Sequence, residues 1–331
     1  MGRGQPGSRM GRLLRWIRPV LALAVALWLA EAFALWGFVA SAPVAPEAPV
    51  RPAPWPRGQA LPRFSHIFLI LMENRAPSQT FTGLQTPYLQ ALARRYSVET
   101  NDWGVRHPSL PNYIALTSGS TQGIRTDCAA CYVNAPNLAS EFAGRNVSWD
   151  AFLEGLPRAG SLTAVNWPTL YAGKHDPFRY YRNVRTQRAL RSHLLPLADL
   201  WPRLKRADGV PRFIWITPNL CHDMHSCPAI VGDLWLRLVL PRILSSSAYR
   251  NGGVVFITWD EGNASPPGAP GQGGRVPLMA ISPSSRRGGR LGLPVTHEAL
   301  LHTIETVLNV PCLGKSCEAP TLGGLFVRHS P

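Results

Sequence analysis

The chain has 331 residues, of which 45% are hydrophobic, and a formal net charge of +15 at pH 7. This apolar content is enough for the core of one large or two modest domains, which excludes an intrinsically disordered chain. Arginine supplies nearly all of the positive charge and favours phosphate or carboxylate ligands, but no Arg–aromatic repeat or known nucleic-acid module accompanies it, so a nucleic-acid partner is not expected.

The N-terminal segment has the pattern of an export signal or a membrane anchor. The first 18 residues carry five arginines and no acid, and residues 19–40 are apolar except for Glu31. This apolar stretch is longer than the roughly 7–15 residues of a signal-peptide core and close to the roughly 20 residues that span a bilayer. Cleavage after Ala42 is possible in principle, but Pro43 disfavours it. We therefore predict an uncleaved anchor.

Three regions follow from this pattern. Residues 1–42 form the basic leader with its signal-anchor or transmembrane segment, and residues 43–62 form a Pro/Ala-rich, semi-rigid tether. Residues 63–331 form the folded domain. We predict an exported protein, attached to the membrane through its N-terminal segment, with an extracytoplasmic domain. If the leader is cleaved, the protein is secreted.

Apolar runs and amphipathic segments alternate along the folded domain. Strands are predicted at residues 66–72, 146–152, 213–217, 254–259 and 276–281. Helices are predicted at residues 87–95, 112–116, 137–144, 195–206, 232–246 and 297–308. This alternation predicts an α/β fold, a three-layer sandwich with a largely parallel central sheet. The segment 167–188 does not fit this rhythm, and we expect it to line a pocket.

Two pairs of polar residues follow buried strands. Glu73 and Asn74 come after HIFLILM, and Asp260 and Glu261 come after VVFITW. Parallel sheets bind ligands at the carboxyl ends of their strands. An acid at such a position is poorly solvated without a partner, and two adjacent acids repel each other unless a cation neutralises them. The four residues are therefore candidate metal ligands, with surface acids as the alternative.

Ser109 lies in a proline-bounded turn ahead of the helix-like segment YIALTSG. A hydroxyl at a helix N-terminus has free backbone N–H groups beside it, which suit an anionic phosphoryl group. A simple N-cap is the alternative, and the local sequence does not decide between the two. A serine hydroxyl is a weak nucleophile that needs a metal or a base, and the acids described above imply such a metal.

A short loop between two cysteines holds His222, Asp223 and His225, which form a dense set of possible ligands. A disulfide across this loop would fix the directions of their side chains. His297, at the start of a predicted helix, is a further candidate, although a single histidine is more often a structural residue.

The six cysteines fall into three close pairs, which behind an export signal predict local disulfides. The sequence does not fix the connectivity among the 15 possibilities. CAAC alone is also compatible with a redox or zinc motif, but it lacks the second pair of a zinc ribbon. The pairs are Cys128/Cys131, Cys221/Cys227 and Cys312/Cys317.

Several segments, taken in order, resemble the bacterial phosphoesterase family that includes acid phosphatases and phosphatidylcholine-type phospholipases C. The resemblance extends from about Phe64 to Gly314. That family is similar in fold to alkaline phosphatase, so an alkaline-phosphatase-like sheet is expected. The segments are LILMEN, HPSLPNYIALTSG, VSWDAFLEGLP, YAGKHDPF, ITPNLCHDMHSC, GDLWL, FITWDEG and VTHEALLHTIE.

The resemblance also implies roles for individual residues. It implies Ser109 as the nucleophile and Asn112 as a donor to the phosphate oxygens. His225 and His297 match further active-site positions. The implied metal ligands are Glu73, Asn74, Asp260, Glu261 and Asp223.

Two departures from the family pattern concern the edge of the site. Relatives commonly continue the first motif as ENRSF or ENHSY, whereas Arg75 is followed here by Ala76 and Pro77. His222 stands where many relatives have asparagine, so its role as a ligand is the least supported.

The residues and the resemblance together predict a metal-dependent phosphoester hydrolase that acts through a phosphoserine, as an acid-phosphatase-like monoesterase. One alternative is a phospholipase C-type phosphodiesterase that acts on phospholipid headgroups, which the anchor and the basic surface favour. Another is a catalytically inactive, membrane-tethered binding protein, which the changed first motif permits. Mixed oxygen and imidazole ligands suit Zn, Mn, Fe or Ca, so the identity of the divalent metal stays open.

Overall fold

The computed structural model describes residues 60–206 and 208–327. The predicted leader and nearly all of the predicted tether therefore lie outside the described residues. Within the described part of the chain, no helix is both long and apolar enough to cross a membrane.

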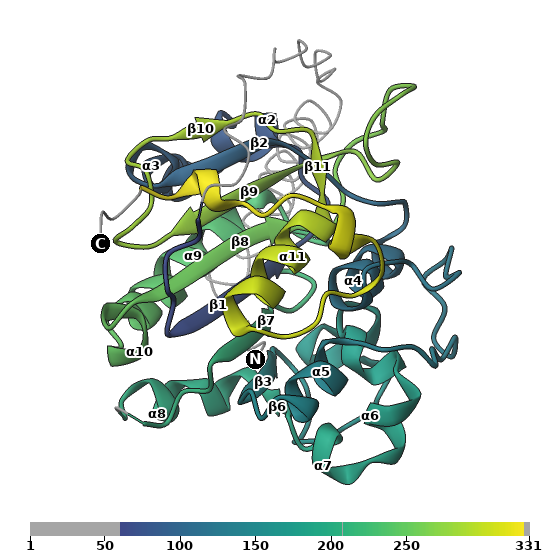
Figure 1. Cartoon of the computed structure of the whole chain (residues 1–331). Coiled ribbons are helices and arrows are strands. Elements are labelled where there is room, and N and C mark those ends of the chain that lie inside the picture. The colour runs from purple at the N-terminus through teal and green to yellow at the C-terminus, as the bar shows by residue number, and fades with distance from the viewer. Residues whose placement is uncertain (1–59, 207, 328–331) are drawn as a thin grey trace, which may run out of the picture. The chain divides into compact units, whose positions relative to one another are not determined.

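A nine-stranded sheet forms the centre of the domain (Figure 1). The strand order is β10-β2-β9-β8-β1-β7-β3-β6, and β11 also pairs with β2. In this sheet β9 runs antiparallel to β2 and β8, and the other neighbouring strands are parallel. The strands are β1 His66–Met72, β2 Ser97–Trp103, β3 Trp149–Leu153, β6 Leu194–Pro196, β7 Phe213–Thr217, β8 Gly253–Trp259, β9 Arg275–Ile281, β10 Arg290–Leu291 and β11 Val295–Thr296. A separate hairpin pairs β4 Val165–Asn166 with β5 Tyr171–Ala172.

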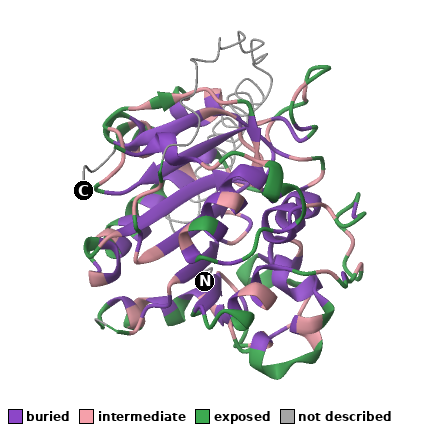
Figure 2. Cartoon of the chain, in the orientation of Figure 1, coloured by how far each residue is buried: buried purple, intermediate pink, exposed green. Residues whose placement is uncertain are grey.

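Helices cover both faces of this sheet. The odd-numbered residues of β1 pack in one apolar cluster with α4, α5 and α11, and its even-numbered residues from position 68 pack in a second cluster with α3, α8 and α9. The sheet is therefore buried on both sides (Figure 2), which confirms the predicted three-layer α/β sandwich. The helices are α2 Pro77–Phe81, α3 Pro87–Arg95, α4 Ser109–Ser118, α5 Leu138–Gly144, α6 Arg182–Thr186, α7 Arg188–Arg191, α8 Leu200–Leu204, α9 Ala229–Leu244, α10 Ser247–Arg250 and α11 His297–Leu308.

One strand of the central sheet was not predicted, and one predicted helix was wrong. Strand β2, SVETNDW, was not predicted, because its central residues are polar. Its Glu99 and Asp102 are nevertheless buried. The helix predicted at residues 195–206 divides into the strand β6, a 3-10 turn and the short helix α8. Pairing with β3 determines β6, and this long-range contact leaves no local signal.

Asp233 of α9 caps the N-terminus of a different helix, α3. Its carboxylate accepts the backbone N–H groups of Tyr88 at 2.9 Å and Leu89 at 2.8 Å. Because Asp233 is only 1% exposed, Asp233→Ala is expected to lower the free energy of unfolding by about 1–2 kcal/mol. Chemical denaturation measures this change. Asp233→Asn keeps one acceptor and should lose less. Equal stability of wild type and Asp233→Ala would contradict this capping role.

Candidate active site

Two carboxylates meet at the edge of the sheet where β1 and β8 end. The parallel register pairs Met72 with Trp259, so Glu73 and Asp260, which follow them, leave the sheet side by side. The backbone N–H of Asp260 donates to the carbonyl of Met72 at 3.0 Å. The backbone N–H of Asn74 donates to Asp260 Oδ1 at 3.1 Å. Asn74 has a left-handed φ of 53°, which turns the chain out of the strand directly after Glu73.

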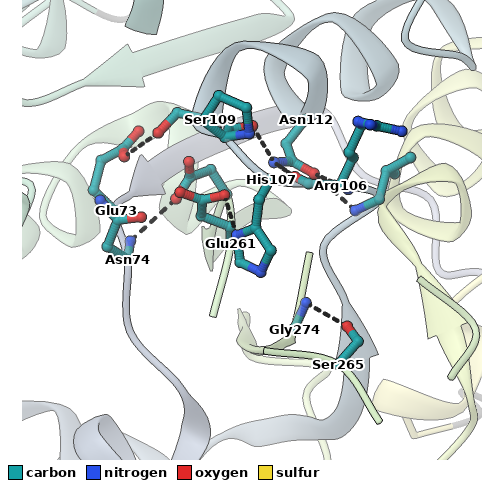
Figure 3. A network of polar contacts seen from close by, with 12 residues as sticks. Glu73, Asn74, Arg106, His107, Ser109, Asn112, Glu261, Ser265 and Gly274 are labelled. Carbon is teal, nitrogen blue, oxygen red and sulfur yellow. Dashed lines mark hydrogen bonds and ion pairs between the residues drawn. The ribbon is translucent and has the colours of Figure 1, made fainter. Parts of the chain in front are cut away.

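The hydroxyl of Ser109 points toward these acids (Figure 3). Ser109 is the first residue of α4, and its Oγ donates to Glu73 Oε2 at 3.0 Å. Tyr113, one turn further along the helix, donates from its hydroxyl to Glu73 Oε1 at 2.5 Å. Ser109 also interacts with Asp260 through its side chain. The structure thus brings the predicted nucleophile and both strand-end acids together.

A histidine, His175, lies between Glu73 and Asp223. His175 Nε2 lies 3.1 Å from Glu73 Oε1, and its Nδ1 lies 3.2 Å from Asp223 Oδ2. Its ring stacks on Tyr113, with the ring centres 5.2 Å apart. The backbone N–H of His225 donates to Asp223 Oδ1 at 2.7 Å. His175 therefore connects the loop that holds Asp223 and His225 with the strand-end acids.

Burial dominates the electrostatics of this cluster. Burial raises the pKa of Glu73 well above its usual range, and the nearby Asp260 and Asp223 raise it further. Burial likewise raises the pKa values of Asp223 and Asp260. Burial and the neighbouring lysine lower the pKa values of His175 and His225. Buried carboxylates beside neutral imidazoles are the groups that bind divalent cations.

The cluster also contains polar atoms without hydrogen-bond partners. His175 Nε2, Asp223 Oδ2 and Asp260 Oδ2 are buried and make no hydrogen bond. Such atoms destabilise a protein by about 1–3 kcal/mol each unless they are satisfied. Glu73, His175 and His225 each offer a ligand atom, and these three atoms lie within 4.8 Å of one another. The residues present therefore fit a divalent cation.

Asn112 lies differently from the predicted arrangement. Its Oδ1 accepts the backbone N–H groups of Val105 at 2.7 Å and Arg106 at 3.1 Å. Its amide donates to the carbonyls of Arg106 at 2.5 Å and Pro108 at 3.2 Å (Figure 3). Both amide protons and the amide oxygen of Asn112 are used in these bonds, so in this structure Asn112 has no free donor for a phosphate oxygen. Asn112 holds the loop that leads into α4 and thereby orients Ser109.

Glu261 and His297 lie next to the cluster and contact residues that flank it. Glu261 Oε2 lies 2.6 Å from His107 Nδ1, which belongs to the loop before α4 (Figure 3). His297, at the start of α11, contacts the backbone carbonyl of Asp260 at 2.6 Å through Nε2. His297 is fully buried. In this arrangement Glu261 faces His107, and His297 fixes the backbone of Asp260.

All three predicted cysteine pairs form disulfides, so the thiols of Cys128 and Cys131 are not free to bind zinc. The disulfide across residues 221–227 closes the histidine loop, in which Asp223 and His225 turn toward Glu73. His222 instead pairs with Glu154, with 2.9 Å between Nδ1 and Oε2. The disulfides are Cys128–Cys131, Cys221–Cys227 and Cys312–Cys317.

Sequence reasoning missed three residues of the site. His175 and Lys174 come from the segment that was expected only to line a pocket, and Tyr113 follows Ser109 on the same helix. A local signal existed in the segment KHD, where a histidine stands between two charged residues. Nothing in the sequence alone showed that this segment packs against α4 and brings His175 to Glu73.

The fold and this cluster define a class of protein: a three-layer α/β protein with a serine hydroxyl beside buried acids at the strand ends. The sequence profile of the Phosphoesterase family matches residues 68–311, and the chain belongs to this family. The predicted resemblance is thereby confirmed. The protein is a hydrolase that acts on phosphoric ester bonds.

Curated relatives support this assignment. The chain is 28% identical to a phosphatidylinositol-3-phosphatase of Mycobacterium tuberculosis over 270 residues, which cover 81% of this chain and 84% of that protein. It is 25% identical to an acid phosphatase of Aspergillus fumigatus over 287 residues, which cover 83% of this chain and 60% of the fungal enzyme. The chain thus spans most of the bacterial relative and a smaller part of the fungal one.

Solved structures confirm the fold. A protein of the alkaline phosphatase superfamily from Vibrio parahaemolyticus matches with a TM-score of 0.51 and 12% identity, over 80% of this chain and 72% of that one. Murine ectonucleotide pyrophosphatase/phosphodiesterase 5 matches with a TM-score of 0.53 and 10% identity, over 80% of this chain and all of that one. The chain therefore shares the overall fold of these two structures.

Proposed function

We propose that the protein is a metal-dependent phosphomonoesterase of the acid-phosphatase type that acts through a phosphoserine at Ser109. The observation that carries this proposal is the 3.0 Å contact between Ser109 Oγ and Glu73 Oε2. This contact lies beside two buried carboxylate oxygens, Asp223 Oδ2 and Asp260 Oδ2, that have no hydrogen-bond partner. The phosphatases among the relatives support a monoester substrate, such as a small phosphoester or a phosphorylated lipid headgroup.

A divalent cation would be held by acids of both strand ends together with the histidine loop. When bound, it supplies positive charge that makes a hydroxyl more acidic and neutralises phosphoryl oxygens. Zn, Mn, Fe and Ca are each compatible with these oxygen and nitrogen ligands. The residues that would hold it are Glu73, Asn74, Asp260, Asp223, His175 and His225, with Glu261 close by.

The residues of the chain provide the two halves of the reaction. The hydrogen bond to Glu73 orients Ser109 Oγ and gives its proton an acceptor. Oγ attacks phosphorus, the bond to the leaving oxygen breaks, and that oxygen takes up a proton. Water then attacks phosphorus and releases a proton, the bond between phosphorus and Ser109 Oγ breaks, and Glu73 returns its proton to Oγ. Ser109 and inorganic phosphate are released.

Three disulfides point to an oxidising, extracytoplasmic compartment. We infer that the catalytic domain, residues 63–331, works there and that residues 1–42 attach it to the membrane. Fractionation of cells that express the full chain tests the anchor. Recovery of the phosphatase in the membrane fraction, with release by a protease added outside, is the expected result.

The metal is tested most directly by stability as a function of pH. The raised pKa values of the site carboxyls mean that their contribution to stability is present below their unfolded pKa of about 4. It is lost as the pH rises toward about 8, the pKa of Asp260. Metal-free protein should therefore have a lower Tm at pH 8 than at pH 5. Adding the cognate cation should restore most of that Tm at pH 8.

The same samples connect the metal to activity. Chelation should abolish hydrolysis of p-nitrophenyl phosphate, and one of the four cations should restore it in step with metal content. Ser109→Ala serves as the control, since it should bind the cation and gain stability without turnover. Undiminished turnover in protein shown to contain no metal would overturn the metal dependence.

A further inference from the structure

Lys174 places an ammonium group beside the site. Its Nζ lies 2.7 Å from Asp127 Oδ2 and 3.3 Å from His225 Nε2. The side chain is 23% exposed, whereas Glu73 and Asp260 are fully buried. The ammonium is close enough to both of these acids to interact with their charges. Lys174 is therefore more accessible to solvent, and to a substrate, than the buried acids.

One carboxylate connects this lysine to the turn that carries the serine. Asp127 Oδ2 accepts from Lys174, and Asp127 Oδ1 accepts the backbone N–H of Leu110 at 2.9 Å. Leu110 directly follows Ser109. The adjacent disulfide Cys128–Cys131 restrains the loop that holds Asp127. The position of the ammonium is thus fixed relative to the serine hydroxyl before any substrate binds.

The hydrogen bonds also fix the direction of His225. A lysine ammonium donates and does not accept, so His225 Nε2 is the acceptor in the contact with Lys174 unless a bound cation takes its place at Nε2. The other ring nitrogen, Nδ1, then carries the proton and donates to Ser226 Oγ at 3.0 Å. These two contacts use two of the three N–H groups of the Lys174 ammonium, and no described contact uses the third. A negatively charged oxygen in the site can occupy it.

The charge of the substrate determines how strongly each class of ester interacts with the Lys174 ammonium. A phosphomonoester carries close to two negative charges near neutral pH, because its second pKa is about 6. A diester carries one, since an organic group replaces one of the charged oxygens. We propose that Lys174, held by Asp127, binds a non-bridging phosphoryl oxygen and selects phosphomonoesters over phosphodiesters. This proposal rests on the proposed function and specifies its substrate class.

The test compares the two ester classes in a lysine variant. Lys174→Gln should lower kcat/KM for p-nitrophenyl phosphate by about 100-fold, the usual effect of losing one donor to a developing or resident charge. It should change kcat/KM for bis(p-nitrophenyl) phosphate much less. Lys174→Arg should retain most of the monoester preference, because it keeps the charge. Lys205→Gln, on an exposed lysine at the end of α8, is the matched control and should change neither value.

Inhibition provides a second measurement that does not depend on diester turnover. The inhibition constant of inorganic phosphate should rise about as steeply in Lys174→Gln as monoester activity falls, while that of dimethyl phosphate stays nearly constant. Asp127→Asn, which loosens the lysine, should change both inhibitors in the same direction as Lys174→Gln but less strongly. An equal loss for monoester and diester, or no loss for either, would refute the selection by Lys174.

The outcome is separable from that of the proposed function. If Ser109→Ala abolishes monoester turnover while Lys174→Gln leaves the ratio of the two esters unchanged, the phosphoserine mechanism stands and the role of Lys174 is wrong. If Ser109→Ala retains turnover, the proposed function itself fails. Thermal unfolding of each variant verifies that the comparison is made on folded protein.

Discussion

Ser109→Ala is expected to lower kcat for p-nitrophenyl phosphate by about 10⁴–10⁶-fold, as removal of a covalent nucleophile does in other hydrolases. The reason is that Ser109 Oγ is the hydroxyl that lies 3.0 Å from Glu73 Oε2, at the meeting point of the strand-end acids. The fold should persist, because the variant loses one hydrogen bond that contributes about 1 kcal/mol. Steady-state kinetics and thermal unfolding measure the two effects.

Ser118→Ala is the matched control for this variant. Ser118 ends the same helix, is equally buried, and donates to the carbonyl of Ile114 at 2.9 Å. It should keep nearly full activity. Acid quenching of the wild type during turnover should trap phosphate on Ser109, which peptide mass spectrometry detects. Activity of Ser109→Ala within tenfold of the wild type would remove the serine from the mechanism.

Glu73→Gln should abolish activity and yet stabilise the metal-free protein. Glu73 is fully buried beside Asp223 and Asp260, so its ionised form destabilises the fold when no cation is present. Because its folded pKa is raised, this effect should be absent near pH 4 and grow as the pH rises. At pH 8 the metal-free variant should be more stable than metal-free wild type by roughly 1–3 kcal/mol. Denaturation at several pH values measures this difference.

The same change should weaken metal binding, since glutamine offers no charged oxygen. Activity on monoesters should fall by at least about 10³-fold, because the orientation of Ser109 and the negative charge of Glu73 are lost together. Glu318→Gln, an exposed acid far along the chain, should change neither stability nor activity. Wild-type turnover in Glu73→Gln, or a loss of stability that is the same at every pH, would show that Glu73 is a structural residue.

Much of the sheet was predictable because its strands are buried on both faces. Strands β1 and β7 and helices α3 and α11 were predicted with the bounds that the structure shows. Uninterrupted apolar runs and amphipathic periodicity report burial directly. The polar strand β2 and the short strand β6 gave no such signal, since pairing with distant strands forms them.

The site was predictable in part for a similar reason. The serine turn and the acids of both strand ends could be identified, because parallel strands deliver the residues that follow them to one edge. Which atoms of those residues are free could not be identified. The amide of Asn112 donates to two backbone carbonyls of its own loop, and His297 contacts the backbone carbonyl of Asp260.

The sequence by itself determined the α/β class, the family and the positions of Glu73, Ser109 and Asp260. These features follow from local hydrophobicity and from short motifs, whereas the structure decided the pairing of the cysteines. The tertiary structure alone decided that His175 and Lys174 join the site. Their segment carries no strong periodicity, and its place against α4 and Glu73 depends on contacts with residues far apart in the chain. The direction of a polar side chain depends on such contacts, because each hydrogen bond needs a partner at a defined distance and angle.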